Sequence, residues 1–399
     1  MLSSQIPEEF KDIRPYAPDE LPQVFQELVA DEQFMTIATK MVPGLQQKLA
    51  AFLPSLTGGV GGGSALAVQK ALFYPIVKHI ADTCTASLDL SLPDRFDRQL
   101  PHTFITNHRD IVLDSAFLSV LLVDNGFPTT VEIAIGDNLL IFPWIKKLVR
   151  INKSFIVQRS LPMRELLRAS QTMSRYMHFA IDQKQENIWI AQREGRAKDS
   201  DDRTQEALLK MMAMGGEGSV IDRLRQLHLV PMALSYEYDP CDYLKAKEFQ
   251  QKRDDPAFKK SRQDDLTNMQ TGIFGQKGHV HFQAAPCIDE WLNTVPADTP
   301  KTELFSLIAS HIDSEIHRSY RLYPCNYVAA DALYGESTYS SHYTHQQLLD
   351  FDEYLSARIA LIDLPEPDEA FLRKCILTMY ANPVFNKETA MQQWSKLTH

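Results

Sequence analysis

The sequence lacks the features of several large protein classes. Its five cysteines are scattered and include no CxxC pair, which fits reduced thiols better than a disulfide framework or a structural zinc site. The net charge of −10 leaves no basic excess for general nucleic-acid binding. No apolar run reaches the ~20 residues of a membrane span, and the N-terminus has no basic start followed by an apolar core. We therefore expect a cytoplasmic protein without nucleic-acid partners.

A glycine-rich run, Gly58–Ser64, lacks the ending of a phosphate-binding loop. It contains no Gly-Lys-Ser/Thr, and no predicted strand precedes it. A joint between two helices is favoured at this position.

Apolar periodicity divides the chain into three regions: a helical region at residues 1–95, an α/β domain at 96–290 and a helical region at 291–399. Strands are predicted near 102–106, 130–135, 154–157, 187–191, 229–236 and 279–283. Helices are predicted near 18–30, 33–53, 65–88, 111–123, 139–149, 162–183 and 204–214, and again from 302 onward. The charged stretch 250–265 is expected to be a solvated excursion. The fold class is therefore α/β, with a mixed central sheet flanked by helices and with helical N- and C-terminal extensions.

The first candidate site is the segment Asn107–Asp114, between a predicted strand and an apolar helix. Imidazole titrates near neutral pH, and a neighbouring carboxylate such as Asp110 or Asp114 can fix its tautomer. The segment therefore predicts either that His108 acts as a general base or that Asp110 merely caps the helix.

A local basic cluster lies downstream in this acidic chain. Between Pro143 and Arg168 there are seven Lys or Arg residues and one Glu, a local balance of +6. Arg159 follows an apolar strand directly, and its planar guanidinium suits bidentate binding of phosphate. Several of the other cations are equally typical of solvated helix faces.

Two further strands carry candidate residues. Ile188–Ala191 leads into Gln192–Lys198, where Arg193, Glu194 and Arg196 surround Gly195 and could cradle an anion. Leu229–Glu237 reads as a core strand with an early proline.

Taken in order, these four blocks resemble the glycerolipid acyltransferase family, in particular its bacterial glycerol-3-phosphate acyltransferase branch. That family shows NH-x4-D, a strand ending in a phosphate-binding Arg, F-x-E-G-x-R and V-P-I-x-I-x-Y-E. The matching segments here are Asn107–Asp114, Phe155–Arg159, Gln192–Arg196 and Val230–Glu237. Two departures stand out: Leu113 occupies the family's Asp position, and the glycine turn is one residue shorter before its Arg.

The resemblance implies transfer of a fatty acyl group from acyl-CoA or acyl carrier protein to glycerol-3-phosphate or lysophosphatidate, in phospholipid biosynthesis. It implies His108 as general base with Asp114 or Asp110 as its partner. The acceptor phosphate would be held by Arg159, Arg193, Arg196 and Lys198, with Glu194 and Gly195 shaping the turn. No metal or further cofactor is expected, and the protein would work at the inner face of the membrane with lipid substrates and possibly acyl carrier protein.

Three other interpretations stay open. One is an O-acyltransferase of amino-acid lipid synthesis, whose acceptor carboxylate a basic site could also bind. The second is a metal-dependent hydrolase that uses His108 with His279 and His281, since an HxH pair on a strand can supply two ligands. The third is a non-catalytic scaffold at a lipid surface, which would not need His108.

Overall fold

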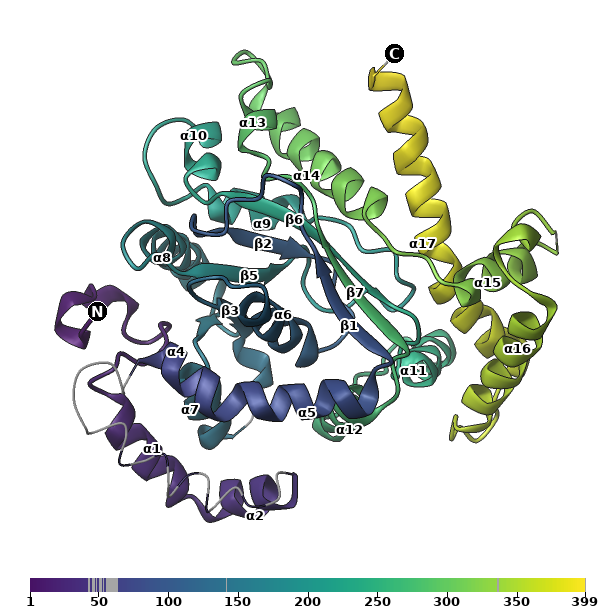
Figure 1. The fold of residues 1–399 in the computed structure, drawn as a ribbon, viewed down its shortest axis with the longest axis horizontal. Coiled ribbons are helices and arrows are strands. Elements are labelled where there is room, and N and C mark those ends of the chain that lie inside the picture. Colours follow the sequence, from purple (N-terminus) through teal and green to yellow (C-terminus); the bar gives the residue numbers. More distant parts are fainter. Residues whose placement is uncertain are drawn as a thin grey trace.

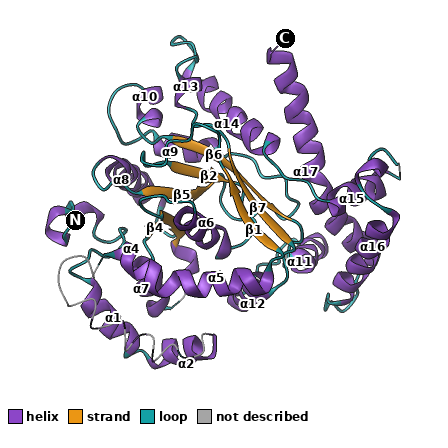
Figure 2. Cartoon of the chain, in the orientation of Figure 1, coloured by secondary structure: helices purple, strands orange, loops and turns teal. Residues whose placement is uncertain are grey.

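The computed structural model of the protein describes residues 1–41, 44, 47, 49, 52, 54, 64–140, 142–335 and 337–398. Within these residues, a seven-stranded sheet occupies the centre and helices surround it (Figures 1 and 2). The glycine-rich run lies outside the described residues except for Ser64. The Ser64 hydroxyl accepts a hydrogen bond from the Ala67 amide and so caps the helix that follows.

The strand order across the sheet is β1-β7-β6-β2-β5-β3-β4. β7 runs antiparallel to β6, and the other neighbouring pairs are parallel, so the sheet is mixed as the sequence predicts. The strands are β1 (Ser87–Ser91), β2 (Thr103–Thr106), β3 (Val131–Gly136), β4 (Ser154–Val157), β5 (Asn187–Ala191), β6 (Leu229–Tyr236) and β7 (His279–Ala284). The five parallel strands β6, β2, β5, β3 and β4 end at one edge of the sheet.

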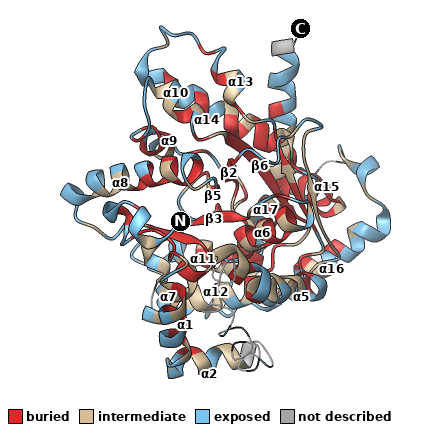
Figure 3. Ribbon diagram, turned by 60° about the vertical axis from the view of Figure 1, so that its left-hand side comes forward, coloured by how far each residue is buried: buried red, intermediate tan, exposed pale blue. Residues whose placement is uncertain are grey.

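Alternate side chains of the strands enter two different cores, because successive residues of a strand point to opposite faces. Ile105 and Ile190 contribute to one cluster, whereas the neighbouring Phe104 and Trp189 contribute to the other. The first face is covered by α8 (Met163–Asp182), α9 (Glu206–Met212) and α14 (Lys301–Arg318), and the second by α5 (Tyr74–Cys84) and α6 (Leu113–Asp124). Figure 3 shows the buried residues concentrated along the strands between these layers.

The N-terminal region is less purely helical than predicted. The helix predicted at 65–88 runs without a break through α4 (Ala65–Val68), the π-helical turn η3 (Gln69–Phe73) and α5, but it ends at Cys84 and strand β1 follows it. β1 forms because its backbone pairs in parallel with β7, from Ser87 opposite His279 onward. Among the described residues, the region also contains η1 (Ser3–Gln5), η2 (Glu8–Phe10), α1 (Leu21–Val29) and α2 (Glu32–Met41).

Further helices lie between the strands along the chain: η4 (Asp137–Leu139), α7 (Pro143–Ile151), α10 (Val220–Arg225), α11 (Asp242–Asp254) and α12 (Arg262–Phe274). The short helix α13 (Asp289–Leu292) follows the last strand, β7. The stretch 250–265 is solvated as predicted, since every residue in it except Gln250 is exposed or half-buried, and its two ends belong to α11 and α12. Gln250 is buried, because its side chain hydrogen-bonds the Glu366 carbonyl and the Asp368 amide.

The C-terminal region is helical, as predicted. It contains α14, α15 (Pro324–Tyr334), η5 (Ser340–His342), α16 (His345–Ala360) and α17 (Glu369–Thr398). α15, α16 and α17 share an apolar cluster of their own, whereas α14 packs on the sheet. The three-region division itself stays a prediction.

Candidate active site

The candidate residues gather where the parallel strands end. His108 follows β2, Arg193 to Arg196 follow β5, and Arg159 follows β4. Because these strands are parallel neighbours with β3 between β5 and β4, their carboxyl ends lie at the same edge. Loops at such an edge are the usual place for ligands in α/β proteins.

His108 and Asp114 form a hydrogen-bonded pair at this edge. The His108 Nδ1 atom lies 2.8 Å from Asp114 Oδ2. The side chain of Asp114 is fully buried in the first turn of α6, whereas that of His108 keeps 13% of its surface exposed. The amino end of a helix favours a negative charge, so the position suits an ionised carboxylate. The ring of Trp189 packs edge-on against the imidazole, 5.5 Å between centroids.

Asp114 is held by more than the histidine. Its Oδ2 atom also accepts the backbone N–H groups of Arg109 at 2.7 Å and Asp110 at 3.1 Å. Its Oδ1 atom accepts the hydroxyl of Tyr236 at 2.9 Å. These donors fix the carboxylate, and through it they fix the orientation of the His108 ring.

Asn107 ties the loop that carries His108 to the sheet. Its side-chain amide donates to the Leu234 carbonyl at 2.9 Å, and its carbonyl oxygen accepts the Leu234 N–H at 2.8 Å. The side chain thereby extends the pairing between β2 and β6 by one further position. His108 therefore starts from a fixed point on the sheet.

Asp110 has a structural setting different from that of Asp114. Its Oδ1 atom accepts the N–H groups of Val112 and Leu113, both at 2.8 Å, and so closes the turn before α6. Burial, followed by the charge of Asp114, raises the pKa of the Asp110 carboxyl. Of the two predicted partners of His108, the structure therefore brings Asp114 to the ring and gives Asp110 the capping position. The turn takes up the extra residue between His108 and its carboxylate.

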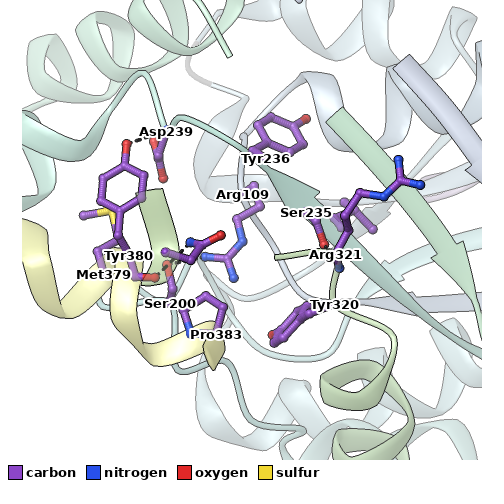
Figure 4. Close-up of a pocket in the computed structure, with 12 residues that line it drawn as sticks. Arg109, Ser200, Ser235, Tyr236, Asp239, Tyr320, Arg321, Met379, Tyr380 and Pro383 are labelled. Carbon is purple, nitrogen blue, oxygen red and sulfur yellow. Dashed lines mark hydrogen bonds between the residues drawn. The ribbon is translucent and has the colours of Figure 1, made fainter. Parts of the chain in front are cut away.

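Arg109 points into a pocket beside the pair (Figure 4). Its guanidinium donates to the Ser200 hydroxyl and lies 3.8 Å from an Asp202 oxygen. Tyr380 and Pro383 of α17 form another wall of this pocket. The C-terminal helix thus contributes to the surroundings of the loop that carries His108.

The outer part of the predicted anion site contains Arg159, Arg193, Glu194 and Gly195. Arg159 forms an ion pair with Glu194, 3.1 Å between nitrogen and oxygen, which joins the loops after β4 and β5. Both side chains are exposed, so solvent screens the pair. Gly195 has φ of +67°, in the left-handed region that favours glycine.

Arg196 lies deeper than Glu194 and Gly195, which are exposed. Its Nη2 atom donates to the Asn268 side chain at 3.1 Å, while its Nη1 atom is buried without a hydrogen-bond partner. Burial opposes its charge, but the nearby Cys241, Asp239 and Asp110 raise the pKa of Arg196 overall. A buried cation with an unused donor therefore lies close to Asp110 in the loop that carries His108.

Lys198 forms an ion pair with Glu248, which also lies within 4 Å of Lys252 and Lys260. Burial lowers the pKa of Lys198. The structure therefore places this predicted phosphate ligand in a separate cluster of charges around Glu248 of α11.

The histidines of the alternative metal site are dispersed. His279 contacts the Ser87 hydroxyl at 2.8 Å, and His281 pairs with Asp89. In the part of the chain that the structure describes, His108, His279 and His281 do not bring their ring nitrogens together as a metal site requires.

Sequence reasoning assigned no role to Tyr236, Asn268 or Asp202. Tyr236 stands in the V-P-x-x-x-x-Y-E block, so the motif alone could have marked it. Asn268 and Asp202 lie in segments without such a pattern and contact the site only through the fold.

None of the described helices combines the length and hydropathy that crossing a bilayer requires.

Comparisons with known proteins identify part of the chain. Residues 88–235 match the family model described as Acyltransferase. Among solved structures, the chain is similar to the crystal structure of the 1-acyl-sn-glycerophosphate (LPA) acyltransferase PlsC from Thermotoga maritima. That match has 10% identity and a TM-score of 0.36, and it covers 73% of this chain and 91% of that chain. No curated protein matches the sequence. The family match includes His108, Asp114, Arg159 and Arg196 and ends at Ser235.

Proposed function

Since this chain is an acyltransferase whose family domain spans residues 88–235, we propose that it acylates the hydroxyl of a phosphorylated glycerol. The acceptor would be glycerol-3-phosphate or lysophosphatidate, and the donor would be acyl-CoA or acyl carrier protein. The observation that carries the proposal is the 2.8 Å contact between His108 and Asp114 at the edge of the sheet.

In the proposed reaction, His108 acts as the general base. Its Nδ1–H donates to Asp114, so the other ring nitrogen, Nε2, is the one that accepts a proton. As Nε2 takes the proton of the acceptor hydroxyl, the oxygen attacks the thioester carbonyl carbon. The tetrahedral intermediate then expels the thiolate, which takes the proton back from the imidazolium. The products are an ester and a free thiol, and no acyl-enzyme forms.

Asp114 acts in this scheme as a positioning residue. The imidazolium that forms during transfer lies against its buried carboxylate, which stabilises the positive charge. The backbone amides and the Tyr236 hydroxyl hold the carboxylate in place, so no reorganisation is needed during the reaction.

The acceptor phosphate would bind to the arginines at the same edge. Arg196 supports this assignment because its Nη1 donor is buried and unused. Arg159 and Arg193 follow neighbouring strands and could approach the phosphate from the solvent side, with Glu194 orienting Arg159. A lipid acceptor would bring the protein to the cytoplasmic face of a membrane, where the basic segment 143–168 could contact anionic headgroups.

The test is transfer of labelled palmitoyl from CoA and from acyl carrier protein to glycerol-3-phosphate, lysophosphatidate and an N-acyl amino acid. We expect transfer to a phosphorylated acceptor, and we expect His108→Gln to lower it by about 10²–10⁴-fold. His279→Gln is the matched control, because it removes a histidine of β7 that has no part in the mechanism.

Two outcomes would overturn the proposal. Transfer only to the N-acyl amino acid would move the protein to amino-acid lipid synthesis. Equal transfer by the wild type and the folded His108→Gln variant would remove the general base.

A further inference from the structure

A second group of functional side chains lies at the opposite edge of the sheet. His228 immediately precedes β6, and Cys287 and Asp289 follow β7. β6 and β7 are antiparallel, so the start of one lies beside the end of the other. β6 and β2 are parallel, with Leu229 beside Thr103, whereas His108 follows the far end of β2. The group is therefore separate from the proposed active site.

The three side chains converge on a small volume. A ring nitrogen of His228, Cys287 Sγ and a carboxylate oxygen of Asp289 all lie within 4.8 Å of one another. His228 Nδ1 is 2.6 Å from Asp289 Oδ2. Neutral imidazole, thiolate and carboxylate are the three types of side chain that bind zinc in proteins.

Backbone hydrogen bonds fix the segment that carries Cys287 and Asp289 relative to His228. The Ile288 N–H donates to the Leu229 carbonyl at 2.9 Å, and the Ala285 N–H donates to the Pro231 carbonyl at 2.8 Å. The segment with Cys287 and Asp289 is thereby tied to the start of β6, next to His228. A backbone fixed in this way lowers the entropic cost of bringing the three side chains together around an ion.

The polar groups of this cluster are incompletely satisfied. The Asp289 Oδ1 atom is buried and has no hydrogen-bond partner. His102, which is 3% exposed, packs edge-on against His228, and its Nδ1 atom also has no partner. A buried carboxylate oxygen without a donor is costly, and a cation would satisfy it.

We propose that His228, Cys287 and Asp289 bind a divalent metal ion of the zinc class. The thiolate and imidazole ligands favour Zn²⁺ over Mg²⁺ or Ca²⁺, which prefer oxygen ligands. A fourth ligand would be water, because His228 and Asp289 also line an open pocket beside α10.

Binding requires small movements and the release of a proton. The Cys287 thiol loses its proton to solvent as the sulfur–metal bond forms, and the contact between His228 and Asp289 gives way to a metal ion bound by both. With metal–ligand distances of ~2.0–2.3 Å, the three ligand atoms would lie roughly 3.3–3.6 Å apart. The 2.6 Å contact between His228 and Asp289 would therefore lengthen as the ion enters between them.

The position of the site indicates a structural role. An ion there would join the start of β6 to the segment after β7, at the edge of the sheet opposite His108. We therefore expect bound metal to stabilise the fold and to leave the chemistry of acyl transfer unchanged.

The test uses the full chain, freed of metal by a chelator and then titrated with Co²⁺. We expect one ion per chain, a thiolate-to-cobalt charge-transfer band, displacement by Zn²⁺ and release of one proton on calorimetry in buffers of different ionisation enthalpy. Cys287→Ser should lose the charge-transfer band, and Asp289→Asn should weaken binding by at least tenfold. Cys375→Ser, a half-buried cysteine of α17, is the matched control and should bind like the wild type.

The proposal fails if the wild type takes up no stoichiometric Co²⁺, or if the ion binds without a thiolate band. It also fails if folded Cys287→Ser keeps the band or if Cys375→Ser loses it. Should Cys287→Ser not fold, as judged by circular dichroism, the wild-type spectrum and His228→Gln decide. Retention of binding by His228→Gln overturns the site.

Discussion

Two histidine–carboxylate pairs lie at opposite edges of one sheet, and their carboxylates have different surroundings. Asp114 is fully buried, and both of its oxygens accept hydrogen bonds, from His108, Tyr236 and two backbone amides. The Asp289 side chain is 24% exposed and has one oxygen without a donor. A carboxylate whose oxygens are occupied by donors can orient an imidazole, whereas one with an unused oxygen can accept a cation. The neighbours of the carboxylate therefore distinguish two pairs that look alike in residue type.

A third pair supports this distinction. His281 contacts Asp89 on the neighbouring strand, and Arg321 lies 3.3 Å from the same carboxylate oxygen. The carboxylate already has a permanent cation beside it. We therefore assign this pair neither a proton-transfer nor a metal-binding role.

The largest effect on acyl transfer should come from Asp114→Asn. The same substitution in the other pair, Asp289→Asn, provides the comparison. Asp114→Asn replaces an acceptor of the His108 Nδ1–H with a group that can donate, so the ring loses its orientation and the support for its positive charge. We expect acyl transfer to fall by about 10²–10⁴-fold. Asp289→Asn should leave transfer within about twofold, because it lies at the other edge.

The measurement is the initial rate of transfer for both variants at saturating donor. Equal losses in the two variants would show that the pairs are not functionally distinct. A KM increase with unchanged kcat in Asp114→Asn would place that residue in acceptor binding instead.

A histidine without a carboxylate partner should show an intermediate effect, on stability. Among the described residues, His311 of α14 stacks on Trp291, 3.7 Å between centroids. Burial, followed by Arg318, lowers the pKa of His311 to about 4. The His311 imidazole therefore binds a proton more readily in the unfolded chain than in the folded protein. The stability that neutral His311 contributes is complete above pH ~6.5 and is lost as pH falls toward ~4, by roughly 1–2 kcal/mol at pH 5.

Urea unfolding at pH 7 and pH 5 tests this expectation. His311→Phe keeps the stacked ring and removes the titration, so its free energy of unfolding should fall less between these pH values than that of the wild type. An identical decrease in both proteins would show that the pKa of His311 is not lowered in the folded protein.

The smallest effect should follow from Tyr236→Phe. The variant removes one hydrogen bond to Asp114 and keeps the ring in the core. A lost hydrogen bond of roughly 0.5–1.5 kcal/mol corresponds to a decrease in kcat of about twofold to thirteenfold. The same kinetic assay checks it, with stability followed in parallel. A loss as large as that of Asp114→Asn would mean that Tyr236 contacts the reacting groups directly.

The sequence predicted the fold class because the strands are apolar and the polar turns between them are well marked. The family expected from the motifs is confirmed at the level of an acyltransferase domain. Strands β4, β5 and β6 have the predicted bounds. Strand β1 was missed, because Ser87–Ser91 is stabilised by pairing with β7, almost two hundred residues away.

The candidate sites differ in how much the sequence reveals. His108 and Asp114 are six residues apart, so local spacing suggests the pair, and only the turn closed by Asp110 decides between the two carboxylates. His228 and Asp289 are separated by 61 positions and meet through the antiparallel pairing of β6 and β7. No local pattern reports such a contact.

The link between Asn107 and Leu234 has a consequence for dynamics. The Leu234 N–H donates to the side chain of Asn107, in the loop that carries His108. This amide can exchange with solvent deuterium only when the loop leaves the sheet. Its exchange rate therefore measures how often His108, the proposed general base, loses its fixed position, independently of any substrate.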